Sequence, residues 1–128
     1  MTARSAAIDA ILWTLSVTVL VAIVWGSLIP EPVPPLGLQN KLLHFSAYLL
    51  VTFLWLLAAV WSPLRGAGRW PGSTILIVIA SIGVGAAVEL GQGLVPGREG
   101  DLVDALADVI GTTTGLILWA RLRGLLTG

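Results

Sequence analysis

The sequence has 128 residues, of which 56% are hydrophobic and only 11% are charged, and its mean hydropathy is +0.94. Soluble domains carry about a quarter charged residues, so this composition indicates an integral membrane protein and excludes an intrinsically disordered chain. Seven basic residues against seven acidic ones argue against nucleic acid as a partner, and the absence of cysteine excludes disulfides, thiolate metal sites and cysteine nucleophiles.

Four apolar segments are long enough to cross a bilayer, whose hydrocarbon core of about 30 Å requires about 20 helical residues. They predict membrane-spanning helices over about residues 8–29, 41–62, 71–95 and 101–122. The first is predicted to be a retained helix, because its apolar run is longer than that of a signal peptide. Residues 1–128 are therefore predicted to form a single all-α domain, a bundle of four transmembrane helices joined by short loops.

The basic residues predict which side of the membrane each terminus occupies. With both termini in the cytoplasm (N-in/C-in), only Lys41 and Arg98 lie outside, and the five basic residues inside are Arg4, Arg65, Arg69, Arg121 and Arg123. An aromatic belt at the inner interface would consist of Trp13, Trp61, Trp70 and Trp119, with Trp25 near the outer interface. We expect a multi-pass protein of the cell (inner, cytoplasmic) membrane, with the lipid bilayer as its first partner.

The predicted connections on the outer side differ in character. Residues 30–35 contain four prolines and are expected to be stiff, whereas residues 96–101 form a polar turn whose glycines can take positive φ. Small residues recur at a spacing of four, which allows close helix packing in lipid. These residues predict tight packing of the third span on the fourth, and they are Gly83, Ala87, Gly91, Gly111 and Gly115.

Three spans each carry a polar stripe in their outer halves, with spacings of three or four that place its members on one helix face. The stripes are Lys41, His44 and Tyr48 in the second span, Glu89 and Gln92 in the third, and Asp101, Asp104 and Asp108 in the fourth. Stripes that face one another would form one outer-leaflet pocket beside Arg98. The predicted binding pocket is Lys41, His44, Tyr48, Glu89, Gln92, Arg98, Asp104 and Asp108.

Depth makes two of these acids notable. Glu89 and Asp108 are each expected about 10 Å below the outer boundary, where a carboxylate is unfavourable by a few kcal/mol unless it is paired, protonated or solvated. Acids outnumber bases in this region, which favours a bound cation or a protonated carboxyl group.

Structural interpretations remain open for most of these residues. Asp101 and Asp104 also fit the capping of the fourth helix, and His44 fits a place among lipid headgroups. Arg98 fits an anchor for the turn, and Glu89 fits a buried ion pair with Arg98.

The order and spacing of these residues resemble the VanZ-like family. The matching blocks are Asn40-Lys41-Leu42-Leu43-His44-Phe45-Ser46-Ala47-Tyr48, Glu89-Leu90-Gly91-Gln92, Pro96-Gly97-Arg98, and Asp104-Ala105-Leu106-Ala107-Asp108-Val109-Ile110-Gly111 with Gly115. Two residues depart from the family pattern: Asn40 stands where Asp is frequent, and Asp108 stands where Asn is usual. The resemblance implies a small membrane protein with four helices. The founding member is associated with low-level resistance to the glycopeptide teicoplanin, but the family implies no reaction.

Three functions are compatible with the sequence. The first is an envelope protein whose pocket binds a lipid headgroup, a cell-wall precursor or an amphiphilic, glycopeptide-like drug. Arg98, Lys41 and His44 would then hold a phosphate or carboxylate. The second is a membrane enzyme acting on a lipid-linked envelope substrate, with Glu89 as acid or base, His44 as its proton partner and Asp108 as a further catalytic candidate.

The third is a proton- or ion-coupled carrier in which Glu89 and Asp108 titrate. It ranks last because four short helices leave little room for alternating access unless the chain forms an oligomer. No motif requires a cofactor. A divalent cation held by Asp104, Asp108 and Glu89 is the one metal site that these oxygen ligands suggest.

Overall fold

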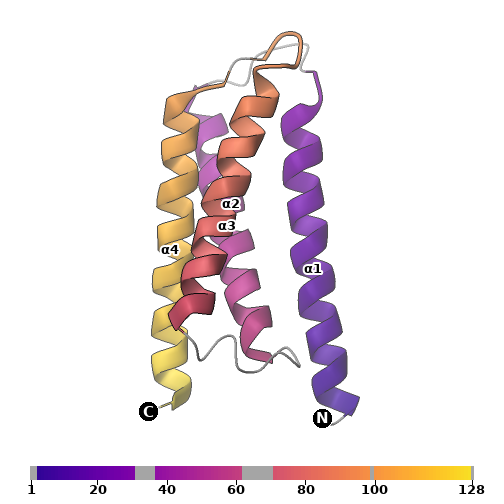
Figure 1. The fold of residues 1–128 in the computed structure, drawn as a ribbon, viewed down its shortest axis with the longest axis vertical. Coiled ribbons are helices and arrows are strands. Elements are labelled where there is room, and N and C mark those ends of the chain that lie inside the picture. Colours follow the sequence, from indigo (N-terminus) through magenta and orange to yellow (C-terminus); the bar gives the residue numbers. More distant parts are fainter. Residues whose placement is uncertain (1–2, 31–36, 62–70, 99, 128) are drawn as a thin grey trace.

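Four α-helices make up the bundle in the computed structural model, which describes residues 3–30, 37–61, 71–98 and 100–127 (Figure 1). They are α1 (Ala3–Leu28), α2 (Gly37–Trp61), α3 (Pro71–Gln92) and α4 (Leu102–Thr127), and these described ranges contain no strand. Each helix is long and apolar enough to cross a membrane. The predicted all-α architecture with four candidate transmembrane helices is confirmed. The side chains of Arg4, Ser5, Val60, Trp61, Pro71, Leu126 and Thr127 are outside the description.

The helix ends differ from the predicted ones in both directions. α1 begins at Ala3 rather than residue 8, and α4 ends at Thr127 rather than 122, because a helix can continue beyond the apolar run that crosses the bilayer. α2 likewise begins at Gly37 rather than 41. α3 ends at Gln92 rather than 95, because Leu94 and Val95 donate to the carbonyls three residues back and tighten the last turn. Gly97 then takes a φ of 83°, as predicted for this turn.

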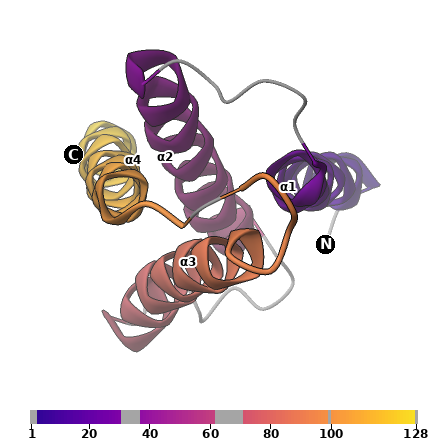
Figure 2. The ribbon, with the colours of Figure 1, turned by 90° about the horizontal axis from the view of Figure 1, so that it is seen from above.

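The helices alternate in direction, so both chain ends lie at the same end of the bundle (Figure 1). At the opposite end, α1 and α3 finish and α2 and α4 begin; we call this the Arg98 end. Seen from above, α2 lies between α4 and α1, and α3 covers one side (Figure 2). α1 and α4 therefore do not touch within the described residues. The polar halves of α2, α3 and α4 all lie at the Arg98 end.

Glycines bring α4 against α2. A Cβ added to Gly111 would lie 2.3 Å from the carbonyl oxygen of Phe45, and one added to Gly115 would lie 2.7 Å from that of Leu49. The prediction that these glycines pack the fourth helix on the third is wrong, because their partners belong to α2. On α3, a Cβ at Gly83 would meet nothing within 4 Å.

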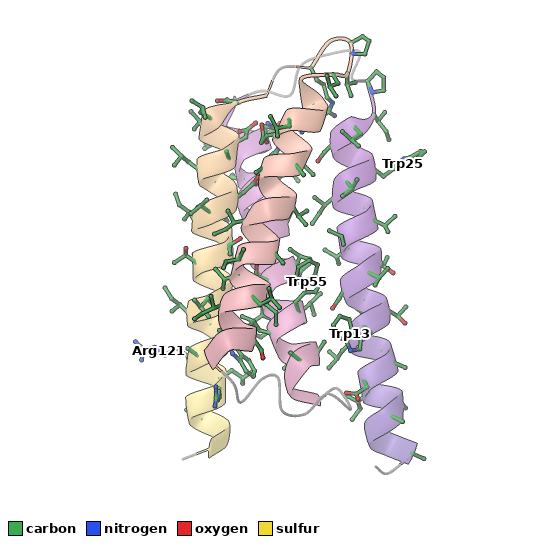
Figure 3. The ribbon with its side chains drawn as sticks, viewed as in Figure 1. Trp13, Trp25, Trp55 and Arg121 are labelled. Atoms are coloured by element: carbon green, nitrogen blue, oxygen red, sulfur yellow. The ribbon has the colours of Figure 1, made fainter. Side chains whose placement is uncertain are left out.

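The tryptophans of the predicted aromatic belt differ in exposure. Trp13 and Trp25 are exposed along α1 (Figure 3), which suits contact with lipid headgroups. Trp119 is only 3% exposed, so its side chain faces the bundle and not the surrounding lipid. Other residues on which the orientation depends lie outside the described side chains: Arg4, Trp61, Arg65, Arg69 and Trp70. The N-in/C-in orientation stays a prediction.

Candidate functional site

His44 lies at the centre of a buried polar cluster at the Arg98 end. Its Nδ1 is 2.9 Å from Oδ1 of Asp108 and 3.6 Å from Oε1 of Glu89, and its Nε2 is 3.9 Å from Oδ2 of Asp104. The side chains of His44, Asp104 and Asp108 are all less than a tenth exposed, and that of Glu89 is 11% exposed. The structure thus brings the stripes of α2, α3 and α4 together, which periodicity left open.

The parallel starts of α2 and α4 explain why their stripes match. Lys41 Nζ bonds Oδ2 of Asp101 at 3.1 Å and Oδ1 of Asp104 at 3.2 Å. The Asn40 side-chain amide donates to the other oxygen of Asp104. Since both helices run inward from the Arg98 end, residues at successive turns face one another, and His44 reaches Asp108 one turn deeper. Polar contacts therefore join the two helices over their first two turns.

Asp101 is the N-cap of α4, as one of the predicted alternatives had it. Its Oδ1 accepts the N–H of Val103 at 2.8 Å, and its own N–H donates to Oε2 of Glu89 at 2.9 Å. The Val103 N–H and the Lys41 ammonium stabilise the charged carboxylate and lower the pKa of Asp101 below its usual value. Glu89 thereby connects the end of α3 to the start of α4.

Three buried oxygens in the cluster have no hydrogen-bond partner among the described residues: Glu89 Oε1, Asp108 Oδ2 and the Tyr48 hydroxyl. The space around two of them depends on Gly85, where an added Cβ would lie 3.0 Å from Asp108 Oδ2 and 3.4 Å from Tyr48 Cε1. Gly85 did not stand out in the sequence, although it is four residues before Glu89 and so on the same helix face.

Arg98 serves as an anchor for α1. Its Nε donates to the carbonyl of Ile29 at 2.8 Å and its Nη2 to that of Gly26 at 3.0 Å. These carbonyls lie at the C-terminal end of α1, where helix carbonyls lack internal partners and favour a cation. The structure thus supports the anchoring interpretation of Arg98, in contact with α1 as well as with its own turn.

A cavity of about 470 Å³ lies between α1 and α2. The polar side chains in its described lining are Ser27, Asn40, His44, Ser46, Tyr48 and Arg98. The apolar side chains are Val19, Ala22 and Ile23 of α1 and Leu43, Ala47 and Leu50 of α2. The other members of the predicted pocket are absent from its described lining: Lys41, Glu89, Gln92, Asp104 and Asp108. Gln92 is buried at the end of α3. The sequence had no signal for the contribution of α1, which carries no polar stripe.

A family model described as VanZ/LLP1 matches residues 22–123, a range that includes all three polar stripes. The chain therefore belongs to the VanZ-like family, as the motifs indicated, and with its four apolar helices it is a multi-pass membrane protein. Comparisons with curated proteins and with solved structures gave no significant match.

Proposed function

We propose that this VanZ-like protein binds an amphiphile in the cavity between α1 and α2. The protein would reside in the cytoplasmic membrane of a bacterial envelope with both termini inside and the Arg98 end outward. The ligand would be an envelope lipid, a lipid-linked cell-wall precursor or an amphiphilic, glycopeptide-like drug. The observation that supports this function is the cavity lining, which is mostly apolar and carries Asn40, His44 and Arg98 toward the Arg98 end.

The size of the cavity suits a ligand site. Its volume of about 470 Å³ falls within the range of small-molecule pockets, about 300 to 1,000 Å³. Along α1 the lining runs from Ser27, next to the carbonyl of Gly26 that holds Arg98, down to Val19. This distance is about 12 Å at the helical rise. The cavity can therefore accept a headgroup and the first part of one chain, while the rest of the ligand stays among the membrane lipids.

The polar end offers groups that recognise phosphate or carboxylate. Arg98 places a guanidinium at the rim, and Asn40 and His44 add amide and imidazole nitrogens beside it. Such nitrogen donors form strong hydrogen bonds with anionic oxygens. Lys41, which the sequence also assigned to anion binding, is absent from the described lining and is bonded to Asp101 and Asp104. The proposed headgroup contacts are therefore Arg98, Asn40 and His44.

Filling the cavity tests the proposal. Ala22→Phe places a ring in the cavity from an exposed position on α1, and Ala47→Phe does so from α2. The control is Ala80→Phe, at an exposed position on α3. The purified proteins would be equilibrated with vesicles of bacterial polar lipids, and retained lipid would be counted by native mass spectrometry. We expect bound lipid in the wild type and in Ala80→Phe, and its loss in both cavity variants. Equal lipid retention in all four proteins would contradict the proposal.

A membrane enzyme is the second candidate, and the position of His44 favours it. His44 lines the cavity and its Nδ1 is 2.9 Å from a buried carboxylate, an arrangement suited to proton transfer. In this alternative His44 would contact a lipid-linked substrate, and Glu89 would act through His44 from 3.6 Å away. Conversion of an envelope lipid by the wild type, abolished in Glu89→Gln, would support it. Conversion that persists in that variant would exclude Glu89 as the acid or base.

A further inference from the structure

The three helices of the polar cluster each contribute one potential metal ligand. His44 of α2, Glu89 of α3 and Asp108 of α4 have ligand atoms that all lie within 4.8 Å of one another. We propose that these three residues bind a divalent transition-metal ion. This inference depends on the cluster alone and does not require that the neighbouring cavity binds an amphiphile.

The distances suit ligands around one ion. Metal–nitrogen and metal–oxygen bonds of about 2.1 Å place adjacent ligand atoms about 3.0 to 3.4 Å apart. The observed separations from His44 Nδ1 are 2.9 Å to Asp108 Oδ1 and 3.6 Å to Glu89 Oε1. Small rotations of the carboxylates would bring all three atoms to metal-binding distances. The set is therefore close to a coordination geometry without any movement of the helices.

Unpartnered oxygens provide an independent indication of a ligand. Asp108 is only 2% exposed, yet its Oδ2 has no hydrogen-bond partner among the described residues, and neither has Oε1 of Glu89. Buried polar atoms are normally satisfied, because an unpaired one has lost its hydrogen bonds to water without replacement. Glu89 Oε1 is the oxygen that faces His44 Nδ1. Asp108 Oδ2 is the second oxygen of the carboxyl group whose Oδ1 contacts the same nitrogen. A bound cation would satisfy both carboxylates at once.

The charges at the Arg98 end leave a place for such a cation. Lys41 is bonded to Asp101 and Asp104. The described ion pairs of Glu89 and Asp108 are both with His44, and Glu89 also accepts the backbone N–H of Asp101 through its other oxygen. Two carboxylates in the apolar part of a membrane are unfavourable unless they are compensated. A divalent ion would neutralise both, and it requires a neutral imidazole as its third ligand.

The donor set indicates the class of metal. A histidine nitrogen with two carboxylates suits Zn²⁺, Mn²⁺ or Fe²⁺, whereas Mg²⁺ and Ca²⁺ prefer oxygen ligands alone. Three protein ligands leave a coordination position open, as in catalytic zinc sites. Since His44 also lines the cavity, that position would lie next to the cavity wall. The sequence suggested three carboxylate ligands, Asp104, Asp108 and Glu89. The proposed site keeps Asp108 and Glu89 and has His44 in place of Asp104.

Zinc binding by the full chain tests the inference. The detergent-purified protein would be stripped with a chelator and titrated with Zn²⁺ alone by calorimetry, and Co²⁺ would report the coordination by its visible absorption. We expect one ion per chain, and an affinity at least tenfold lower in Asp108→Asn and in Glu89→Gln. The matched control is Asp101→Asn, which removes a carboxylate at the same end of the bundle and should bind Zn²⁺ like the wild type.

The competing arrangement is a protonated His44 held between the two carboxylates without a metal. It predicts no stoichiometric Zn²⁺ binding and no cobalt absorption in the folded wild type, and either result would overturn the inference. Equal affinities in Asp108→Asn, Glu89→Gln and Asp101→Asn would overturn it as well. Circular dichroism and gel filtration of each variant would show that it is folded. The cavity variant Ala22→Phe should bind Zn²⁺ normally, so failure of the amphiphile proposal would be distinguishable from failure of the metal site.

Discussion

The two helices beside α2 pack on it in opposite ways. On one side, the backbone of α4 approaches so closely at Gly111 and Gly115 that there is no room for a methyl group. On the other side, α1 leaves a cavity of about 470 Å³, and a Cβ added to Gly26 would meet nothing within 4 Å. A smaller share of α1 than of α2 is buried.

This difference assigns separate tasks to the two interfaces. The α2–α4 pair holds charged groups in fixed positions, because its polar contacts rest on a close backbone interface. The α1–α2 interface is packed less tightly, because a cavity separates the two helices over part of their length. His44 belongs to both, since it bonds Asp108 of α4 and also lines the cavity. The closely packed pair of α2 and α4 thus places its buried polar cluster beside the more loosely packed α1.

The same substitution on the two sides should have very different effects. Gly111→Ala places a methyl group 2.3 Å from the Phe45 carbonyl oxygen and must separate α2 from α4. We expect a loss of about 3 kcal/mol of unfolding free energy, the upper part of the range for overpacked sites. Gly26→Ala enters open space and should be neutral or slightly stabilising, because alanine favours helix. Unfolding in mixed detergent micelles measures both, and similar losses would contradict the comparison.

An exchange of two residues probes the electrostatics of the closely packed interface between α2 and α4, here called the close interface. Asn40→Asp replaces the amide that donates to Asp104 by a carboxylate, so it should destabilise the protein by about 2 kcal/mol. Asp108→Asn removes a carboxylate from the same cluster and should relieve part of that repulsion. We expect the double variant to be at least about 0.5 kcal/mol more stable than the sum of the single effects. Strict additivity in this cycle would show that the two positions are uncoupled.

The exchange also bears on the family pattern. It produces the arrangement with Asp at position 40 and Asn at position 108, each of which is the commoner residue in VanZ-like proteins. Asn40 contacts Asp104 and Asp108 contacts His44, whose Nε2 is 3.9 Å from Asp104. The two departures from the family pattern therefore belong to one connected group of side chains. Together they leave the number of carboxylates in that group the same as in the family pattern.

Arg98 anchors the more loosely packed side, and its removal should loosen α1 alone. Arg98→Ala deletes the hydrogen bonds to the carbonyls of Gly26 and Ile29. The native chain has no cysteine, so a pair of spin labels can be attached to two introduced cysteines. We expect a broader distance distribution between exposed positions Val17 of α1 and Ile79 of α3.

The control pair for this experiment reports on the closely packed helices α2 and α4, at the exposed positions Leu42 and Ile110. Its distance distribution should be the same in wild type and in Arg98→Ala. Broadening of both pairs to the same extent would mean that Arg98 supports the whole bundle and not α1 specifically.

Much of the fold could be predicted because the constraint is simple. Each span must supply about 20 apolar residues, and the chain has four such runs. What periodicity cannot supply is the neighbour of each face. Gly111 and Gly115 indicated a close helix contact, but the choice of α2 over α3 depends on the three-dimensional arrangement.

The site shows the same limit. The spacing of Lys41, His44 and Asp108 placed them on polar faces, and the structure gives those faces their partners. Arg98 also stood out in the sequence as a charged residue next to the polar faces. Its partners are backbone carbonyls of α1, and a backbone carbonyl leaves no mark in the pattern of side chains. The apolar half of the cavity was also beyond prediction, because Val19 and Ala22 look like any lipid-facing residues of a transmembrane helix.

The smallest effect is expected deeper in the close interface, where Thr52 and Thr112 are fully buried with their hydroxyl oxygens 3.5 Å apart. Thr52→Val or Thr112→Val alone leaves one hydroxyl without its partner and should lower the unfolding free energy by about 1 kcal/mol. Replacing both by valine keeps the shape and removes both polar groups, so the double variant should stay within about 0.5 kcal/mol of wild type. Because the glycines already set the separation of α2 and α4, the hydroxyl pair adds little. If the double variant loses as much as the two single variants together, the polar contact itself, and not the backbone approach, holds this part of the interface.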